Sequence, residues 1–379
     1  MQSKLPKVGT TIFTVMSKMA HDAGAINLSQ GFPDFECPDR LKELVVHYLH
    51  DHKNQYPPMA GIPQLREQIA HKVRALYKFE ANPDTEITVT SGATEALFDA
   101  VQAMVHQGDE VIMFDPAYDS YEPAVDMAGG VPVRLPLRLP DYSIDWEQVA
   151  ASVNERTRLI IINSPHNPCG AILGNEDLDG LAAIIEDRDI TVLSDEVYEH
   201  MVFDDEKHCS VLTHPELRSR SFAVFSFGKT YHVTGWKLAY CVAAAQLTAE
   251  FRKVHQFVTF TTTSFLQYAI ADFMAECPEH AIDLAAFYQQ KRDRFCDLMS
   301  SSRFKLTPSR GTYFQLADYS EISDKPDMEF VRELTQEKGV AAIPLAPFYA
   351  EPPSSRIVRF CFCKDDTTLE KAAEILCAI

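Results

Sequence analysis

Short apolar runs alternate with helix-like patterns between residues 85 and 245. Seven runs are predicted to form strands, at 86–90, 110–114, 131–135, 159–163, 191–194, 222–225 and 238–243. Several of them, such as EVIMF and LIIIN, are apolar almost throughout, which is typical of strands covered on both faces. Helical patterns lie between most of the runs, at 94–105, 121–128, 146–153 and 175–186. The alternation predicts an α/β fold whose large domain has a mostly parallel seven-stranded sheet covered by helices.

The pattern changes after residue 247. Long helical stretches at 248–275 and 280–301 are followed by a tail that mixes strand-like and helical segments, at 311–316, 328–338, 340–343, 357–362 and 367–379. This tail predicts a second, smaller α+β domain. The first 40 residues lack clear periodicity. We therefore expect an N-terminal arm and part of the small domain at 1–40, a large domain at 41–280 and a small C-terminal domain at 281–379.

Composition and charge narrow the possible partners. The chain has 379 residues with 35 Lys and Arg against 54 Asp and Glu, a formal net charge of −19. That balance argues against nucleic acids and anionic membranes as partners, although one local cationic pocket for a small anion remains compatible with it. No run approaches the length of a membrane-spanning helix, and residues 1–11 have no apolar core of signal-peptide length. The nine cysteines form no C-x-x-C pattern, so we expect neither a disulfide framework nor a zinc ribbon, and a cytoplasmic location.

Small and polar residues follow five of the predicted strands. Open α/β sheets bind ligands just beyond the carboxyl ends of their strands. These segments therefore predict one binding site at one edge of the sheet, and they lie at 91–94, 116–118, 163–170, 195–198 and 226–230.

The segment 91–94 stands directly before a predicted helix. Its small residues would leave backbone N–H groups open to an anion, which the helix dipole favours. Ser91 or Thr94 could equally serve only to cap the helix. Both readings are open on this segment alone.

Lys229 follows a strand and a glycine. The sequence around it superficially resembles a phosphate-binding loop, but the first glycine of that motif would fall at Ala223. A lysine that is desolvated or close to other cations has a lowered pKa and can form a Schiff base. A nucleotide-binding enzyme built on Gly228–Thr230 is the remaining alternative.

Asp195 ends an apolar strand, so we expect it to be buried beside a cationic partner or hydrogen-bond donors. The sequence DEVYEH does not complete a zinc-binding helix motif, because Glu196 stands where histidine would be required. We expect no metal site.

These motifs together resemble a known family. S-G-A-T-E-A, D-P-x-Y-x-S-Y, N-x-P-x-N-P, S-D-E-V-Y, S-F-G-K-T, G-W-K and a late R-F-C-F occur in the order found in the fold-type-I pyridoxal-phosphate aminotransferases. The chain is most similar to the branch that holds methionine aminotransferases and kynurenine–oxoglutarate transaminases (glutamine transaminase K). The strings N-L-S-Q-G-F-P-D-F and V-A-A-I-P carry that likeness.

The resemblance implies pyridoxal 5'-phosphate as cofactor and a role for each matching residue. Lys229 matches the lysine that binds the cofactor covalently and then moves a proton on the substrate. Asp195 matches the carboxylate that faces the pyridine nitrogen and keeps it protonated, which makes the ring an electron sink. Tyr198 and Asn167 match the donors to the ring's phenolic oxygen, and Tyr118 matches the aromatic residue stacked on the ring.

The phosphate group has its own matching residues. The backbone N–H groups of Ala93 and Thr94 would bind it, with Ser226 and Lys237 nearby. Many relatives carry arginine in place of Lys237, and lysine offers a point charge rather than a planar fork. Tyr56 matches a tyrosine that reaches the phosphate of the neighbouring subunit, which implies a homodimer.

The remaining matches concern the substrate. Arg359 matches the arginine that binds the α-carboxylate, a task suited to a bidentate guanidinium. Gly31 matches a backbone position close to that carboxylate, where a side chain would intrude, and Asn167 also faces the substrate. Phe13 matches an aromatic wall of the pocket. Together with Tyr56, Tyr118 and Phe348 it indicates a pocket for a bulky apolar or aromatic side chain.

The resemblance thus implies an aminotransferase with a ping-pong mechanism. It would move the α-amino group of an amino acid of the methionine, phenylalanine, glutamine or kynurenine class to a 2-oxo acid. A cysteine-S-conjugate β-lyase acting at the same site is one alternative. A non-catalytic regulator that binds pyridoxal phosphate or an amino acid is another.

Overall fold

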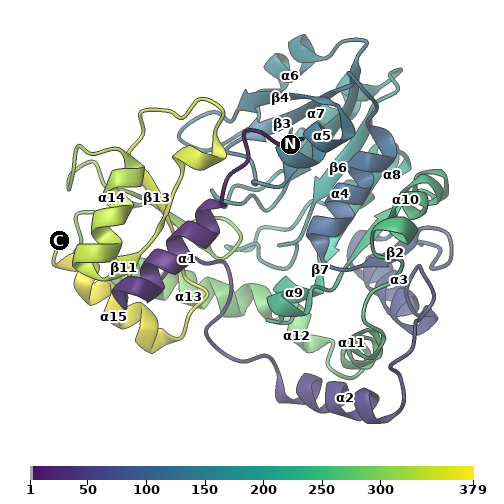
Figure 1. Cartoon of the computed structure of the whole chain (residues 1–379), viewed down its shortest axis with the longest axis horizontal. Coiled ribbons are helices and arrows are strands. Elements are labelled where there is room, and N and C mark those ends of the chain that lie inside the picture. The colour runs from purple at the N-terminus through teal and green to yellow at the C-terminus, as the bar shows by residue number, and fades with distance from the viewer. Residues whose placement is uncertain (1–2) are drawn as a thin grey trace.

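A central sheet organises the larger part of the molecule in the computed structural model, which describes residues 3–379 (Figure 1). Residues 1 and 2 of the predicted arm lie outside the described residues. Within that range the sheet has seven strands in the order β2-β8-β7-β6-β5-β3-β4. They are β2 (Ile87–Thr90), β3 (Glu110–Asp115), β4 (Val131–Pro136), β5 (Thr157–Asn163), β6 (Thr191–Asp195), β7 (Ser221–Ser226) and β8 (Ala239–Ala243). Only β8 runs against its neighbours, so the prediction of a mostly parallel seven-stranded sheet is confirmed.

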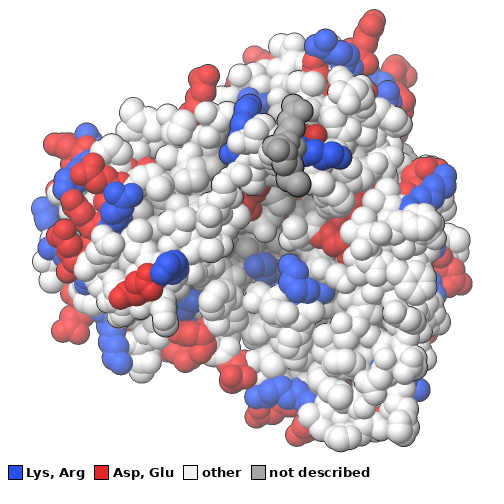
Figure 2. Space-filling model, in the orientation of Figure 1, with Lys and Arg blue, Asp and Glu red and all other residues white. Residues whose placement is uncertain are grey.

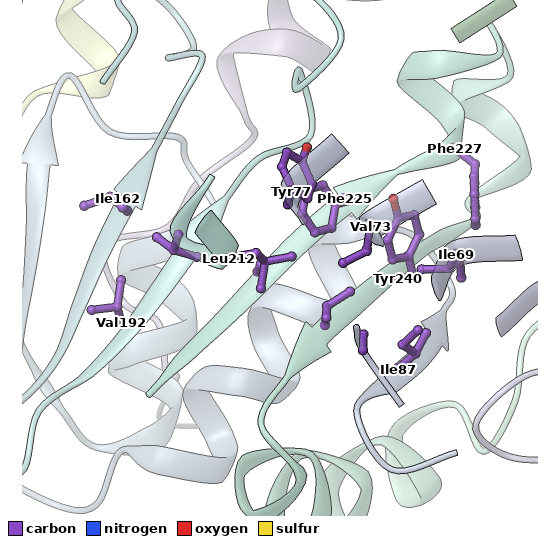
Figure 3. Close-up of a cluster of buried hydrophobic side chains, with 14 of the residues drawn as sticks. Ile69, Val73, Tyr77, Ile87, Ile162, Val192, Leu212, Phe225, Phe227 and Tyr240 are labelled. Atoms are coloured by element: carbon purple, nitrogen blue, oxygen red, sulfur yellow. The ribbon is translucent and has the colours of Figure 1, made fainter. Parts of the chain in front are cut away.

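The apolar strands are buried on both faces, as their composition predicts. In β5, Ile160 and Ile162 pack into the core on one face of the sheet, and Leu159 and Ile161 pack into the core on the other. This follows from the two-residue repeat of strand side chains. Figure 3 shows part of the core on the face of Ile160 and Ile162, where Ile162, Val192 and Phe225 lie with side chains from other elements.

Helices cover both faces of the sheet. The face with Ile160 is covered by α3 (Pro63–Tyr77), α7 (Asn175–Ile185) and α11 (Ser264–Glu276), whose apolar side chains belong to the same core. The other face is covered by α4 (Ala93–Met104), α5 (Tyr121–Ala128) and α10 (Ala245–Val258). The remaining helices of this part are α2 (Asp39–His50), α6 (Trp146–Ser152), α8 (Pro215–Ser219) and the short α9 (Phe227–Thr230).

The C-terminal part builds a second core around an antiparallel sheet. The strand order is β12-β13-β10-β9, from β12 (Ile343–Pro344), β13 (Ile357–Cys361), β10 (Phe314–Asp318) and β9 (Lys305–Leu306). Its helices are α12 (Glu279–Ile282), α13 (Leu284–Leu298), α14 (Asp327–Glu333) and α15 (Asp366–Cys377). The smaller α+β unit is thus present, while the boundaries at residues 40 and 280 stay predictions.

Two predicted segments of the second half are divided in the structure. The stretch 248–275 holds α10 and α11, which are separated at residues 259–263. The run 340–343 forms two short strands: β11 (Val340–Ala341) pairs with β1 (Ile26–Asn27), and β12 pairs with β13. The continuous apolar run conceals this change of partner, because all of its residues are buried.

The first 40 residues contain a helix that the sequence analysis did not predict. In α1 (Ile12–Ala23), Ile12, Met16 and Ala20 are buried at four-residue spacing, and the Thr11 side chain caps the N-terminus. Figure 1 shows α1 in the same lobe as α14 and α15, and Ile12 and Met16 pack in the C-terminal core. The beginning and the end of the chain therefore fold together. Among the helices of the described residues, none is long and apolar enough to cross a membrane.

Candidate active site

All five polar segments meet at one edge of the central sheet. Because β3, β5, β6 and β7 are parallel and β2 runs in the same direction as β7, their carboxyl ends lie on the same side. A cavity of ≈ 230 Å³ is lined by residues of all five segments and by residues from both ends of the chain. Figure 2 shows basic side chains near the middle of this face of the molecule. The lining residues are Phe13, Gln30, Gly31, Gly92, Ala93, Thr94, Leu97, Tyr118, Asn163, Asn167, Asp195, Val197, Tyr198, Ser226, Gly228, Lys229, Thr234, Lys237, Leu238, Phe314 and Arg359.

Lys229 projects into the cavity from α9, the single helical turn that follows β7. Its Nζ donates to the Tyr313 hydroxyl at 2.8 Å and to the Gly31 carbonyl at 3.3 Å. Burial, with smaller effects of nearby charges that include those of Lys237 and Arg359, lowers the pKa of Lys229 to about 8. A sizeable fraction of this amine is therefore neutral, and nucleophilic, near physiological pH.

Asp195 is the last residue of β6 and is buried. The Tyr121 hydroxyl donates to its Oδ2 at 2.7 Å, and the backbone N–H of Val197 lies 3.4 Å from its Oδ1. Burial raises the pKa of Asp195 to about 6, although these two donors and the charge of Lys229 act in the opposite direction. The carboxyl group is therefore mainly ionised at neutral pH and can hold a cationic ring nitrogen.

Tyr198 and Asn167 lie on neighbouring sides of the cavity. Tyr198 is buried and packs edge-on against Tyr313, with ring centroids 5.1 Å apart. The Asn167 backbone N–H donates to Oδ1 of Asn163 at 2.8 Å, which fixes the loop after β5. Burial raises the pKa of Tyr198, so its hydroxyl stays protonated and can donate a hydrogen bond.

The N-terminus of α4 opens on the cavity without a side-chain cap. Gly92 precedes it with φ +91°, and a Cβ at Gly92 would lie 2.9 Å from Cε and 3.1 Å from Nζ of Lys237. Ser226 and Lys237 line the same cavity as Ala93 and Thr94. Of the two readings of segment 91–94, this geometry favours the anion site, since an open helix N-terminus and an ammonium group stand together.

Arg359 is fully buried at the centre of β13. Its two terminal nitrogens donate to Oδ1 of Asn167 at 2.7 Å and to the Ser29 carbonyl at 2.8 Å, while its Nε has no hydrogen-bond partner among the described residues. The guanidinium carbon lies 3.8 Å from the centroid of the Phe314 ring. Burial lowers the pKa of Arg359 to about 10, so the group stays cationic at neutral pH, and no carboxylate of the described residues is hydrogen-bonded to it. A ligand carboxylate would supply that partner.

Aromatic side chains form one wall of the cavity. The Phe13 ring lies 6.5 Å from that of Tyr118 and 5.7 Å from that of Phe348, measured between centroids. Phe348 is buried behind Phe13 and is not among the lining residues of the described chain. At Gly31 a Cβ would lie 2.8 Å from the Phe314 ring, so glycine is required there for close packing.

Tyr56 lies apart from this cavity within a single chain. It is 85% exposed and packs edge-on against Phe260, with ring centroids 5.7 Å apart. Its contribution to a neighbouring subunit stays a prediction.

The structure adds four residues that the sequence analysis did not select. Tyr121 holds Asp195, Tyr313 holds Lys229, Gln30 donates to the Phe13 carbonyl at 2.7 Å, and Phe314 lies under Arg359. Tyr121 stands inside the motif D-P-x-Y-x-S-Y, and Gln30 stands inside N-L-S-Q-G-F-P-D-F. Tyr313 and Phe314 stand outside these motifs, in the sequence G-T-Y-F that begins at Gly311, and no pattern in the sequence marks them.

The cavity contains the groups that pyridoxal phosphate requires of its binding site. It offers the Lys229 amine for the aldehyde, the buried Asp195 carboxylate for the ring nitrogen and an anion site beside Lys237. The buried, unpartnered Nε of Arg359 adds a donor for a further anion. The donor set therefore fits this cofactor together with a carboxylate substrate.

Comparisons with known proteins agree with the geometry. The family model described as aminotransferase class I and II matches residues 23–376. A methionine aminotransferase of Escherichia coli is 52% identical over 375 residues, covering 99% of this chain and 97% of that protein. Kynurenine–oxoglutarate transaminase 3 of Rattus norvegicus is 36% identical, covering 96% of this chain and 87% of its own.

One solved structure extends the likeness to three dimensions. It is the crystal structure of an Escherichia coli protein for which a methionine aminotransferase function was identified. It is 51% identical to this chain with a TM-score of 0.98, and the match covers 100% of this chain and 99% of that one.

Proposed function

We propose, from the premise that the chain belongs to the class I and II aminotransferases, that it transfers the α-amino group of a bulky apolar or aromatic amino acid to a 2-oxo acid. The chain is an aminotransferase. Methionine is the donor class best supported, because a methionine aminotransferase is 52% identical over nearly the whole length. The similarity to a kynurenine–oxoglutarate transaminase supports aromatic donors as well.

The proposed cofactor is pyridoxal 5'-phosphate. Lys229 would bind it covalently, Asp195 would face its ring nitrogen, and Tyr198 and Asn167 would donate to its phenolic oxygen. Tyr118 would stack on its ring. When bound, the cofactor supplies the electron-accepting ring that makes the α-proton of an amino acid removable.

The phosphate group would lie at the N-terminus of α4. The backbone N–H groups of Ala93 and Thr94 point out of an uncapped helix end, and Lys237 stands directly beside Gly92. Ser226 would add a hydroxyl donor from the end of β7. The helix dipole and the ammonium charge both favour the dianion at this place.

The environment of Arg359 is the observation that best supports a substrate with a carboxylate group. A buried guanidinium with an unused Nε needs an anion, and a carboxylate is the planar group that matches its fork. Gly31, Phe13 and Tyr118 surround the space in front of it. Aromatic rings on this wall favour an apolar side chain on the donor.

The proposed working unit is a homodimer in which Tyr56 reaches the neighbouring phosphate site. Tyr56 and Phe257 are 85% and 86% exposed, and Phe260 beside Tyr56 is also exposed. Figure 2 shows few charged side chains over the part of this face where Figure 1 places α11, whereas charged side chains lie over α10 and beside α2. Large aromatic side chains that are exposed next to one another are typical of a protein interface.

The test is the absorbance of the purified protein after incubation with pyridoxal phosphate. We expect a new band at violet wavelengths that is absent from Lys229→Ala. Addition of methionine should then bleach the band, and a 2-oxo acid should restore it. Protein that shows no such band would refute the proposal.

Product analysis distinguishes transamination from β-elimination at the same site. A cysteine S-conjugate that yields mainly pyruvate and ammonia, with little oxo acid from methionine, would replace the aminotransferase assignment by that of a β-lyase. We expect the oxo acid of the donor to form in step with consumption of the acceptor.

A further inference from the structure

The Lys229 amine has two hydrogen-bond acceptors, and both come from outside the central sheet. Tyr313 precedes β10 of the C-terminal unit, and Gly31 belongs to the N-terminal segment. The Lys229 Nζ lies 2.8 Å from the Tyr313 hydroxyl oxygen and 3.3 Å from the Gly31 carbonyl oxygen. These two oxygens are themselves joined, since the Tyr313 hydroxyl donates to the Gly31 carbonyl at 2.5 Å.

This arrangement indicates which group donates the hydrogen in each of these contacts. The hydroxyl hydrogen of Tyr313 is used toward Gly31, so toward Lys229 its oxygen acts as an acceptor. Burial raises the pKa of Tyr313 well above its usual value, so the phenol remains protonated while it plays this part. A neutral primary amine has two N–H bonds and one lone pair, and the two oxygens, which are 2.5 Å from each other, lie on the same side of the amine and attract its N–H bonds to that side.

We propose that Tyr313 is a positioning residue for Lys229: its hydroxyl oxygen, together with the Gly31 carbonyl, accepts hydrogen bonds on one side of the neutral amine and leaves the lone pair available on the side of the cavity. The lone pair is the part of the amine that reacts with an aldehyde and that takes a proton from carbon. This inference rests on the proposed function for the identity of the reacting partner. The geometry that carries it belongs to this chain alone.

Packing keeps the Tyr313 hydroxyl in place. The ring is 1% exposed and makes contacts with Tyr198 and Tyr288, at 5.1 and 5.7 Å between centroids. The Lys229 Nζ lies 5.4 Å from the centroids of both the Tyr198 and Tyr313 rings. The amine is thus enclosed by aromatic walls, and only a few directions remain for its hydrogen atoms.

The same contact links the amine to the substrate side of the cavity. Gly31 lies in the segment whose Ser29 carbonyl accepts from Arg359, so Tyr313 connects Lys229 with the segment that borders the proposed carboxylate site. A substrate that shifts this segment would shift the acceptors of the amine as well. Tyr313 itself transfers no proton in this scheme and forms no covalent bond.

Tyr313→Phe tests the inference, with Tyr288→Phe as the matched control. Both tyrosines are buried in the same aromatic cluster, but the Tyr288 hydroxyl lies beside His232 and Cys363 and not beside Lys229. Each variant loses one oxygen and keeps its ring. Melting temperatures of both variants show whether the fold is preserved.

The first measurement uses the full chain freed of pyridoxal phosphate by hydroxylamine. Acetylation of Lys229 by acetic anhydride is followed by mass spectrometry across a pH series, because only the neutral amine reacts. We expect the pKa of Lys229 to fall by about half a unit or more in Tyr313→Phe, since an acceptor that favours the ammonium form has gone. Tyr288→Phe should match the wild type.

The second measurement uses the loaded enzyme with methionine and a 2-oxo acid. We expect kcat to fall by about tenfold in Tyr313→Phe with KM for methionine changed less than about twofold, because orientation of the amine and not substrate binding is lost. An unchanged acetylation profile in Tyr313→Phe, or equal effects of both variants, would overturn the inference. The acetylation result stands even if the chain binds no pyridoxal phosphate, so the two proposals can fail separately.

Discussion

At the scale of single residues, burial moves the pKa values of Lys229 and Asp195 toward 7. It lowers the pKa of Lys229 to about 8 and raises that of Asp195 to about 6. Between these values an appreciable share of the amine is neutral while the carboxylate is ionised, which is the combination that a nucleophilic lysine and a ring-nitrogen partner require. The fold creates this window because Asp195 at the end of β6 and Lys229 on α9, directly after β7, both lie at the same buried edge of the sheet.

The planar guanidinium of Arg359 can bind a carboxylate through two parallel hydrogen bonds, which a lysine ammonium group cannot do. Arg359→Lys keeps the charge but loses the fork, its two hydrogen bonds to Asn167 and Ser29, and the contact with the Phe314 ring. We expect kcat/KM for methionine to fall by about 100-fold, with pyridoxal phosphate binding nearly unchanged. Steady-state kinetics and the cofactor absorbance check the two parts.

Arg356→Lys is the control for this substitution. Arg356 lies just before the same strand but pairs with Asp324 on the surface. It should change kcat/KM less than about twofold. Equal losses in the two variants would contradict a special role for Arg359.

At the scale of elements, the start of α4 depends on one glycine. Gly92→Ala would place a side chain in the left-handed region at φ +91° and against Lys237. We expect the affinity for pyridoxal phosphate to fall by at least about tenfold and the free energy of unfolding by about 1–2 kcal/mol. Gly235→Ala, where a Cβ would meet nothing within 4 Å, should leave both nearly unchanged. Equilibrium titration with the cofactor and thermal unfolding measure the two quantities.

A buried cluster joins α4 to α10 behind this helix start. The Glu95 side chain accepts from the Ser91 backbone N–H and lies 2.6 Å from Nδ1 of His255, whose Nε2 lies 3.0 Å from the Met59 carbonyl. Asp99 is fully buried, and its Oδ2 lies 3.5 Å from the same Nδ1 of His255, but neither of its oxygens makes a hydrogen bond with the described residues. Glu95 is thus satisfied by its partners, whereas Asp99 is not.

The two carboxyl groups therefore differ in what they do for stability. Burial raises the pKa of Asp99 to about 7: His255 acts in the opposite direction, and the charge of Glu95 adds to the effect of burial. A buried neutral Asp99 contributes stability that is fully present below the usual aspartate pKa and is lost as the pH rises through about 7.

Asp99→Asn removes the ionisation and so should stabilise the fold at alkaline pH. We expect a gain of about 1 kcal/mol in the free energy of unfolding at about pH 8, shrinking toward about pH 5. Glu95→Gln should instead destabilise at both pH values, because it weakens the bonds to Ser91 and His255. Denaturant unfolding at the two pH values decides the matter, and destabilisation by Asp99→Asn at the higher pH would contradict the account.

The central sheet could be predicted because its strands are nearly continuous apolar runs separated by helical periods. The short elements could not. In α1 only Ile12, Met16 and Ala20 are buried. These positions can be recognised as the buried face of a helix only when the C-terminal core, on which Ile12 and Met16 pack, is known. The two partners of segment 340–344 are likewise set by pairing with distant strands, which local pattern does not encode.

The same limit applies to the cavity. Residues inside contiguous motifs, such as Lys229 and Asp195, were predicted and do line it. Tyr313 was not predicted, because its hydroxyl becomes important only through contact with Lys229, 84 positions away along the chain, and Gly31, 282 positions away. The residues next to Tyr313 in the sequence do not indicate that its hydroxyl contacts Lys229 and Gly31.

At the scale of the whole molecule, the formal charge of −19 and the cationic cavity belong to different places. Acidic side chains are spread over the outside, whereas Lys229, Lys237 and Arg359 gather where the sheet, the N-terminal segment and β13 meet. Small anions can therefore bind inside a chain whose surface repels polyanions.

Hybrid dimers test the proposed assembly. In a mixture of Lys229→Ala and Tyr56→Ala proteins, half of the randomly formed dimers would be hybrids, and one of the two sites in each would be intact. If Tyr56 serves the neighbouring site, we expect mixing after partial denaturation to recover about one quarter of the wild-type activity. Each variant refolded alone gives the baseline. No recovery, although capture through a different affinity tag on each variant shows mixed dimers, would place Tyr56 outside the neighbouring site.

The pairing of β1 with β11 joins residues 26 and 27 to residues 340 and 341, and Arg359 follows still later. During synthesis the seven strands of the central sheet, with α10 and α11 that help to cover it, are complete once residue 276 has left the ribosome, so this part can fold as a unit. Residues 26 and 27 must then wait, without their strand partner, until residues 340 and 341 have emerged. The nascent chain therefore completes its scaffold before it acquires its substrate-binding side.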